Sequence, residues 1–346
     1  MAQHLLEIEN LKGAYKGIFG VVRAVDDVSF TVDSGEVVGL VGESGCGKST
    51  LAQLCSGSLN PLLHYESGKI LIDGTDIYKI DPEVLRTEIK CKRMSYIPQA
   101  SMDSLNPVKR IRDFIMDVVT ERTRKKTSIM DILRRRTPKK PVKQEVLKMA
   151  GDHLERLGLD RSVLHRYPHE LSGGMKQRVV IGISTLWNPK LLIIDEPTSA
   201  LDVTTQRLVI KTLVNLKKEG VIESMLFISH DITVLGELCD RCGVMYGGKI
   251  VEVGSMSGIL ENPLHPYTQA LISSIVSYNP TRMGKGGLKS IPGTPPDLRD
   301  PPHGCRFHSR CPFVMDICKT TEPPLRAPSL KTTENSGMVA CWLWNR

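Results

Sequence analysis

The chain has few aromatic residues and no long hydrophobic run. Aromatics make up only 5% of its 346 residues, which argues against a protein that stacks the bases of single-stranded nucleic acid. The longest apolar runs, such as residues 191–194, fall far below the roughly 20 residues that a membrane-spanning helix needs. The N-terminus lacks the basic start and apolar core of a signal peptide. We therefore expect a chain that stays in the cytoplasm and reaches a membrane only through a partner that spans it.

The positive charge is confined to one segment. The formal net charge is +8, and between Glu121 and Lys148 eleven Lys and Arg residues accompany three Asp and Glu residues, so this segment alone carries +8. A solvated surface insertion explains it most simply. A contact with anionic lipid is the second reading, because clustered Lys and Arg gain about 1 kcal/mol each near such a surface. Nucleic acid is the third.

Of nine cysteines, four lie in the last forty-odd residues, after a stretch with six prolines between Pro280 and Pro302. Disulfides are rare in the cytosol, and a Pro-rich tail has little core of its own, so a metal staple is the best explanation. Four sulfurs suit zinc or an iron–sulfur cluster. The spacing lacks the paired C-x₂-C of most zinc ribbons and favours iron–sulfur; free thiols remain a third reading. The four residues are Cys305, Cys311, Cys318 and Cys341.

Short apolar runs alternate with helical stretches. Residues 37–41, 94–97, 191–194 and 225–229 read as buried strands, and residues 204–219 as a helix between the last two. This alternation predicts parallel strands with crossover helices. Residues 244–251 have Gly247-Gly248 at their centre and predict a hairpin. Residues 100–168 are polar and helical in pattern, and we expect a separate helical lobe there.

A phosphate-binding loop follows the first buried strand. The segment Gly42-Glu43-Ser44-Gly45-Cys46-Gly47-Lys48-Ser49 fits G-x-x-x-x-G-K-[ST], in its expected place between a strand and a helix. Glycines let backbone N–H groups point at phosphate oxygens, and the helix N-terminus adds the positive end of its dipole. Lys48 is expected to reach the β- and γ-phosphates and Ser49 to ligate Mg²⁺. The expected nucleotide contacts are Gly42, Ser44, Gly45, Cys46, Gly47, Lys48, Ser49 and Thr50.

Two carboxylates end the apolar strand at residues 191–194. Asp195 is placed to hold Mg²⁺ through water. Glu196, one residue further, is placed to orient and deprotonate an attacking water. A capping pair at a strand end is the alternative explanation, and the phosphate loop upstream makes it the weaker one.

Further motifs resemble those of ABC-type ATPases, over roughly residues 5–275. Leu171-Ser172-Gly173-Gly174-Met175-Lys176-Gln177-Arg178 is similar to the family's signature sequence. The other matching elements, in chain order, are an aromatic residue for adenine at Tyr15 (with Phe19 nearby), a Q-loop at Gln99, a D-loop at Ser199-Ala200-Leu201-Asp202 and a switch histidine at His230. Their presence in the family's order makes the resemblance specific.

The resemblance implies a fold and a mechanism. The fold would be α/β: a P-loop ABC-type ATPase with a RecA-like core, an antiparallel β subdomain, a helical subdomain and a C-terminal cysteine-rich extension. Ser172, Gly173, Gly174 and Asp202 would meet ATP that is bound to a second subunit. Gln99 would contact Mg²⁺ or the water and sense the γ-phosphate, and His230 would hydrogen-bond the γ-phosphate.

Other segments resemble the dipeptide/oligopeptide importer branch. These are Ser104-Leu105-Asn106-Pro107-Val108, Tyr167-Pro168-His169-Glu170, and Asn262-Pro263-Leu264-His265-Pro266-Tyr267-Thr268. The tail resembles that branch's cysteine motif, in which four thiolates hold a [4Fe-4S] cluster. The ATPase domain would then span residues 1–277, with a helical subdomain at about 100–187, and the Pro-rich linker and cysteine extension residues 278–346.

The expected function is an ATP-hydrolysing subunit that energises an ABC importer at the cytoplasmic face of the membrane. The implied partners are a second, non-identical ATPase subunit, two membrane-spanning permease subunits and an extracytoplasmic solute-binding protein, without nucleic acid. Peptides come first as solute, and oligosaccharides or nickel second. A soluble ABC-type ATPase acting on DNA or ribosomes is the alternative class, but the chain lacks the fused second ATPase unit or long coiled coil usual there. A regulatory, non-catalytic ATP-binding module is disfavoured because Lys48, Glu196 and His230 are all present.

Overall fold

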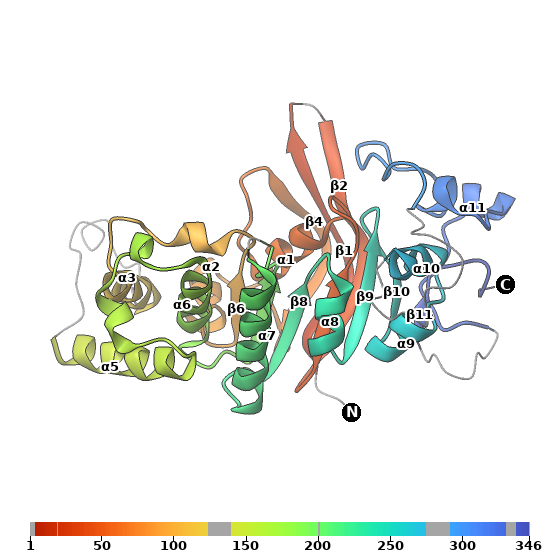
Figure 1. The fold of residues 1–346 in the computed structure, drawn as a ribbon. Helices are drawn as coiled ribbons and strands as arrows, with labels where there is room; N and C mark the ends of the chain where they lie inside the picture. Colours follow the sequence, from red (N-terminus) through yellow and green to blue (C-terminus); the bar gives the residue numbers. More distant parts are fainter. Residues whose placement is uncertain are drawn as a thin grey trace. The chain divides into compact units, whose positions relative to one another are not determined.

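A computed structural model describes residues 4–18, 20–123, 140–199, 201–274, 291–329 and 337–345. Most of the predicted basic segment, the linker at 275–290, Phe19 and Ala200 lie outside these residues. The chain divides into two compact parts, of which the first consists mainly of residues 71–225. The second consists of residues 7–32, 36–70 and 226 onward. Figure 1 shows the order of the helices and strands along the chain.

Two parallel strands form the centre of the first part. β6 (Met94–Ile97) and β7 (Leu191–Asp195) pair from Met94↔Leu191 to Ile97↔Ile194. Every residue of β7 is buried, as expected for a strand covered on both faces. These strands are the ones that the apolar runs predict. β5 (Thr75–Asp76) pairs antiparallel with the end of β4 (Leu63–Ile72).

Helices make up most of the rest of the first part, and α3, α5 and α6 gather together in Figure 1. α6 packs against both α5 and α7. The helices are α2 (Pro82–Val84), α3 (Ile111–Thr123), α5 (Lys140–Arg156), α6 (Gly173–Thr185) and α7 (Val203–Lys218). A π-helical turn lies at Leu85–Ile89, and 3₁₀ turns lie at Ser101–Ser104, Arg161–His165 and Pro168–Glu170. β8 (Ser224–Ile228) crosses the boundary between the two parts.

The second part holds two sets of neighbouring strands. The first set has the order β2-β1-β4, with β1 at His4–Gly17 and β2 at Gly20–Asp33. The second set has the order β11-β10-β9-β3. Its strands are β3 (Val37–Val41), β9 (Arg241–Tyr246), β10 (Lys249–Ser255) and β11 (Met338–Val339). β3 pairs parallel with β9, and β9 and β10 form the predicted antiparallel hairpin about Gly247-Gly248.

The helices of the second part are short. They are α1 (Lys48–Ser56), α8 (Ile232–Leu238), α9 (Met256–Glu261), α10 (Pro266–Ser273) and α11 (Asp316–Thr320), with a 3₁₀ turn at His308–Arg310. The cysteine-rich tail contributes α11, this turn and β11. β11 pairs antiparallel with β10 at Glu252↔Val339, so the tail extends the β9–β10 hairpin by one strand. Among the described residues, no helix combines the length and the apolar character that crossing a membrane requires.

Candidate nucleotide-binding and catalytic site

The phosphate loop joins β3 to α1 and depends on glycine. Gly45 and Gly47 have φ of 79° and 109°, which residues with a Cβ rarely adopt. A Cβ on Gly47 would also lie only 2.0 Å from the backbone oxygen of Ala24. Gly47 is the N-cap of α1, so the loop presents the positive end of that helix to whatever it binds. This geometry suits an anion.

Lys48 is buried at the start of α1, with 4% of its surface exposed. Its Nζ donates hydrogen bonds to the carbonyl oxygens of Gly42 (2.7 Å) and Glu43 (3.0 Å), so the ammonium is held across the loop. Phosphate oxygens can replace these carbonyls as acceptors. Burial raises the pKa of the neighbouring Cys46 thiol, and the charge of Lys48 opposes this only in part. We therefore expect Cys46 to be a neutral thiol at physiological pH.

Tyr15 lies beside the first turn of α1. Its phenolic oxygen accepts a hydrogen bond from Thr50 Oγ1 at 3.3 Å, which ties β1 to the helix that follows the phosphate loop. Ser44 is exposed, whereas Ser49 is partly buried. These predicted contact residues therefore lie in one region of the second part, around the loop and its helix.

His230 lies in the same part, between the end of β8 and the start of α8. Its side chain is exposed. The next residue, Asp231, caps α8 by accepting a hydrogen bond from the Thr233 N–H at 2.9 Å. The cap fixes where the chain turns, so His230 stays at the carboxyl end of a buried strand.

The predicted carboxylates lie at the carboxyl end of β7 in the first part. Asp195 is the last residue of the strand and is 1% exposed, and Glu196 follows it. Glu196 has φ of 46°, a left-handed conformation that is costly for a residue with a Cβ and is often found at functional sites. Because β6 and β7 run parallel in register, Gln99 comes to the same edge. Its Nε2 donates to Glu196 Oε2 at 3.3 Å.

The serine of the Ser-Gly-Gly turn begins helix α6. Ser172 is its N-cap, and its hydroxyl accepts a hydrogen bond from the Met175 N–H at 3.3 Å. Ser172 and Gly173 are both exposed. Gly174 is required by packing, because a Cβ there would lie 2.4 Å from Thr205 Cγ2. The turn therefore presents a hydroxyl and the N-terminus of a helix on the surface.

Asp202 begins helix α7 in the same way. It accepts hydrogen bonds from the Thr205 N–H at 3.0 Å and from Thr205 Oγ1 at 2.7 Å. These bonds lower the pKa of the exposed Asp202 carboxyl. Ser172 and Asp202, the two residues predicted to face a partner subunit, are thus N-caps of helices in the first part. Thr205 of α7 packs against Gly174 of α6 and so keeps the two helix starts together.

The predicted residues fall into two groups. Gln99, Asp195, Glu196, the Ser172 turn and Asp202 belong to the first part, and Tyr15, the phosphate loop and His230 belong to the second. Within the first group, Gln99 and Glu196 are brought into hydrogen-bonding distance. Within the second, Tyr15 is joined to α1.

Two residues beside the phosphate loop are absent from the sequence-based prediction. The Tyr267 hydroxyl accepts a hydrogen bond from the Glu43 N–H at 2.8 Å, and the Arg310 guanidinium pairs with the Glu43 carboxylate. Tyr267 lies in the segment 262–268, whose sequence resembles the importer branch. That resemblance did not predict that Tyr267 lies beside the phosphate loop. Arg310 lies next to a tail cysteine, and no local pattern connects it with a loop 267 residues away.

The four tail cysteines line one pocket together with Phe307, Trp342 and other residues. The Cys305 N–H donates to the Cys318 carbonyl oxygen at 2.8 Å, which holds these two segments together. Burial raises the pKa of Cys305 to about 12 and that of Cys341 to about 11, and the charge of other tail cysteines raises each pKa further. Within the described ranges, no group of three or more His, Cys, Asp or Glu side chains is arranged to hold a metal ion.

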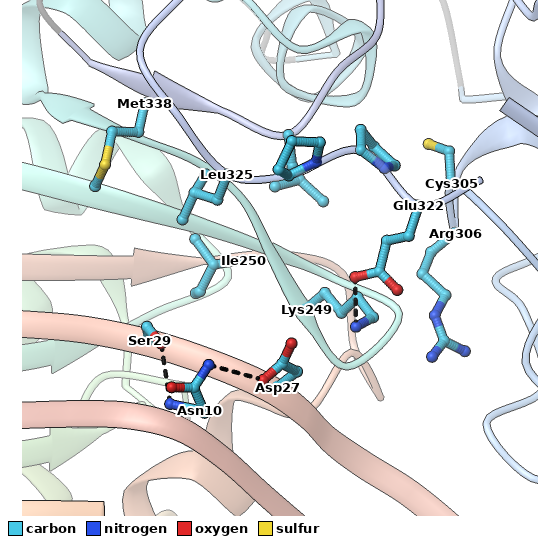
Figure 2. Close-up of a pocket in the computed structure, with 14 residues that line it drawn as sticks. Asn10, Asp27, Ser29, Lys249, Ile250, Cys305, Arg306, Glu322, Leu325 and Met338 are labelled. Carbon is cyan, nitrogen blue, oxygen red and sulfur yellow. Dashed lines mark hydrogen bonds and ion pairs between the residues drawn. The ribbon is translucent and has the colours of Figure 1, made fainter. Parts of the chain in front are cut away.

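A second cavity, of about 350 Å³, lies between the tail and the strands of the second part. Figure 2 shows Glu322 and Lys249 pointing toward one another across it, with Asn10 and Asp27 hydrogen-bonded on another wall. The ion pair between Lys249 Nζ and Glu322 Oε1 measures 2.6 Å. Arg306 reaches Asp26 from the same side at 2.5 Å. The polar side chains thus link the tail to β2 and β10.

The sequence matches two protein families and several known transport proteins. The ABC transporter family matches residues 25–199, and the family described as oligopeptide/dipeptide transporter, C-terminal region, matches residues 251–318. The dipeptide transport ATP-binding protein DppD of Caldanaerobacter subterraneus is 40% identical over 320 residues, covering 92% of each chain. The oligopeptide transport ATP-binding protein AppF of Bacillus subtilis is 38% identical, covering 99% of this chain and 98% of its own.

Solved structures show the same fold. A dimeric bacterial ABC transporter cassette matches with a TM-score of 0.58 at 24% identity, covering 72% of this chain and 98% of its own. A dimeric post-hydrolysis cassette bound to ADP and Pi matches with a TM-score of 0.56 at 25% identity, covering 72% and 98%. The predicted α/β ABC-type fold is confirmed. The chain therefore belongs to the ATP-binding subunits of ABC transporters, in the branch with the oligopeptide/dipeptide C-terminal region, and is an ATPase coupled to transport.

Proposed function

We propose that this chain hydrolyses ATP, as one half of a head-to-tail pair of ATPase subunits, to energise the import of peptides. The single observation that carries the proposal is the phosphate loop, in which a buried Lys48 spans a glycine turn at the N-terminus of α1. The relatives named for dipeptide and oligopeptide transport supply the substrate class.

The loop residues fit a triphosphate. Lys48 would release the carbonyls of Gly42 and Glu43 and bind β- and γ-phosphate oxygens. Ser49 and Asp195 would hold Mg²⁺ with Gln99 nearby, and their hydroxyl, carboxylate and amide oxygens are ligands that this hard cation prefers. When bound, Mg²⁺ neutralises charge on the β- and γ-phosphates. Tyr15 would cover the adenine.

Hydrolysis needs a base and an oriented water. Glu196 would accept a proton from water at its carboxylate as the water oxygen attacks the γ-phosphorus and the bond to ADP breaks. Gln99, which already donates to Glu196 at 3.3 Å, would orient this water. His230 would donate a hydrogen bond to the γ-phosphate. The left-handed backbone of Glu196 supports the proposal, because such a conformation fixes the direction of its side chain.

The second subunit would complete the site. Ser172, Gly173 and Gly174 present an exposed hydroxyl and a helix N-terminus, a combination that binds phosphate. They would meet ATP held by another chain, with Asp202 beside the joint. We propose a similar but non-identical ATPase as that chain, two membrane-spanning permease subunits, an extracytoplasmic solute-binding protein and a position at the cytoplasmic face of the membrane.

The tail cysteines would hold a [4Fe-4S] cluster. Zinc, which four thiolates also suit, is the alternative. Four cysteines that line one pocket supply the four thiolates that such a cluster needs. Cys305, Cys311, Cys318 and Cys341 would be its ligands, and its role would be to hold the tail together.

The cluster can be tested by its colour. Protein purified without oxygen should be brown, with broad absorption near ~400 nm. Changing Cys318 to Ser should remove this absorption, whereas changing the buried Cys55, which lies on α1, should leave it. A colourless wild-type protein that contains zinc would refute the cluster.

The nucleotide site and the substrate need separate tests. Lys48→Ala should lower ATP binding and turnover by orders of magnitude, because the phosphates lose their main counter-charge in a shielded site. Lys69→Ala is the matched control, since Lys69 is an exposed lysine whose ammonium pairs with Glu9 at the surface. Unchanged turnover in Lys48→Ala would refute the site. Peptide import is refuted if the solute-binding protein that serves this transporter captures only oligosaccharides or nickel.

A further inference from the structure

The tail reaches the phosphate loop through one buried arginine. Arg310 ends the 3₁₀ turn His308–Arg310, directly before Cys311, and 4% of its side chain is exposed. Its Nη1 and Nη2 donate to the two carboxylate oxygens of Glu43 at 2.8 and 3.1 Å. Such two-point pairing is among the strong hydrogen-bonded ion pairs. Glu43 is the second residue of the phosphate loop.

Other contacts fix the direction of the guanidinium. Its Nε donates to the Pro292 carbonyl oxygen at 2.7 Å, and Nη1 also donates to the Tyr246 hydroxyl at 3.1 Å. The rings of Tyr246 and Phe307 lie 5.7 and 6.0 Å from the guanidinium carbon. Like every arginine side chain, Arg310 is positively charged at physiological pH. Together these contacts hold the guanidinium of Arg310 in one place, so it acts as a fixed positive charge.

The backbone of Glu43 transmits this position to Lys48. Its N–H donates to the Tyr267 hydroxyl at 2.8 Å, and its carbonyl oxygen accepts from Lys48 Nζ at 3.0 Å. The ring centroids of Tyr246 and Tyr267 are 4.5 Å apart. Tyr246, which accepts a hydrogen bond from Arg310, therefore packs against the tyrosine that accepts one from Glu43. Glu43 is thus held by the tail at its side chain and joined to the phosphate-binding lysine at its backbone.

The ion pair with Arg310 also neutralises the negative charge of Glu43. A carboxylate in a loop that binds a triphosphate repels the ligand unless it is paired. We propose that Arg310 is a positioning residue for ATP: it neutralises Glu43 and holds it in place, so that the C-terminal tail sets the ATP affinity of the phosphate loop. The inference rests on the proposed role of Lys48 in binding phosphate.

A matched control lies in the same tail. Arg306 is 8% exposed and pairs with Asp26 on β2, at the cavity in Figure 2. It holds the tail but has no hydrogen bond to Glu43 in the described structure. Arg306→Met should therefore remove a buried ion pair that attaches the tail to β2, without exposing the Glu43 charge.

The experiment measures the Kd of a fluorescent ATP analogue for the full chain, and KM and kcat of the assembled transporter. Arg310→Met should raise Kd and KM about tenfold, equivalent to about 1.4 kcal/mol, with kcat within about twofold. Adding Glu43→Gln to Arg310→Met should restore most of the affinity, because no unpaired carboxylate remains. Arg310→Lys keeps the positive charge, so its Kd for ATP should lie between those of the wild type and Arg310→Met.

Three results would overturn the inference. They are an unchanged Kd in Arg310→Met, a double variant that binds as weakly as Arg310→Met, or an equal loss in Arg306→Met. If Arg310→Met does not fold, Arg310→Gln, which also removes the positive charge, gives the same comparison with and without Glu43→Gln. Lys48→Ala separates the two proposals: ATP binding that survives this change refutes the nucleotide site itself. If Lys48→Ala abolishes binding while Arg310→Met leaves it intact, only the role of Arg310 is refuted.

Discussion

Replacing Glu196 with Gln should stop ATP turnover while leaving ATP binding intact. The two side chains have nearly the same shape, and Gln can keep the contact with Gln99 Nε2, which measures 3.3 Å. The substitution removes the negative charge, and with it the ability to take a proton. A positioned base contributes about 10²- to 10⁴-fold to the rate, which corresponds to roughly 3–5 kcal/mol of barrier. We expect kcat to fall by that factor, and the Kd for ATP to change by less than about threefold, well under 1 kcal/mol.

The assay is phosphate release by the transporter assembled with its partner subunits, since one ATP site needs residues from two chains. Glu219→Gln serves as the control because Glu219 is an exposed carboxylate at the end of α7 in the same part of the chain. The Kd is measured separately by fluorescence of a labelled nucleotide. If turnover by Glu196→Gln stays within about tenfold of the wild type, below the range of a general base, then Glu196 is not the base.

Other properties are open to test. His153 is buried with its Nε2 at 2.8 Å from Thr185 Oγ1, and burial lowers its pKa to about 4. The unfolded state therefore binds the proton first, and stability should be lost as pH falls from about 6.5 to 4. The free energy of unfolding, measured with urea, should fall between pH 7.5 and pH 4.5 by about 2–3 kcal/mol less in His153→Gln than in the wild type. Equal falls in the two proteins would contradict this. Gly47→Ala should lower Tm more than Gly45→Ala, because both have positive φ but only the Cβ at 47 meets backbone, at 2.0 Å from Ala24. Equal Tm values would show that the loop relaxes.

Local patterns were enough to predict the buried strands and the hairpin. β3, β6 and β7 are short apolar runs, and a strand buried on both faces has this pattern wherever it occurs. The turn between β9 and β10 is set by Gly247 and Gly248, with φ of 55° and 83°. These features depend on neighbouring residues only, and so the sequence alone carries them.

The long strands β1 and β2 were not predicted from their own residues. Buried and exposed positions are mixed irregularly along β1 and the first half of β2, whereas residues 28–33 of β2 alternate strictly, a strand pattern that went unused. An antiparallel β subdomain was expected only through the family resemblance. Tertiary packing, which a single-sequence pattern does not record, decides these strands.

The site was predictable where its residues form motifs and not where they meet through the fold. The phosphate loop, Glu196 and Ser172 are each read from a few consecutive residues. Arg310 and Glu43 are 267 positions apart and belong to no common motif. The strand β11 and the buried arginines Arg306 and Arg310 help to bring the tail to this loop.

A structure of the Glu196→Gln transporter with ATP and Mg²⁺ tests the central claim most directly. The triphosphate should lie against Lys48 and Ser49 of this chain, with the signature serine of the partner ATPase on its other side. In the partner's site, Ser172 of this chain should contact the γ-phosphate. A triphosphate bound away from Lys48, or a signature turn that meets no nucleotide, would contradict the account.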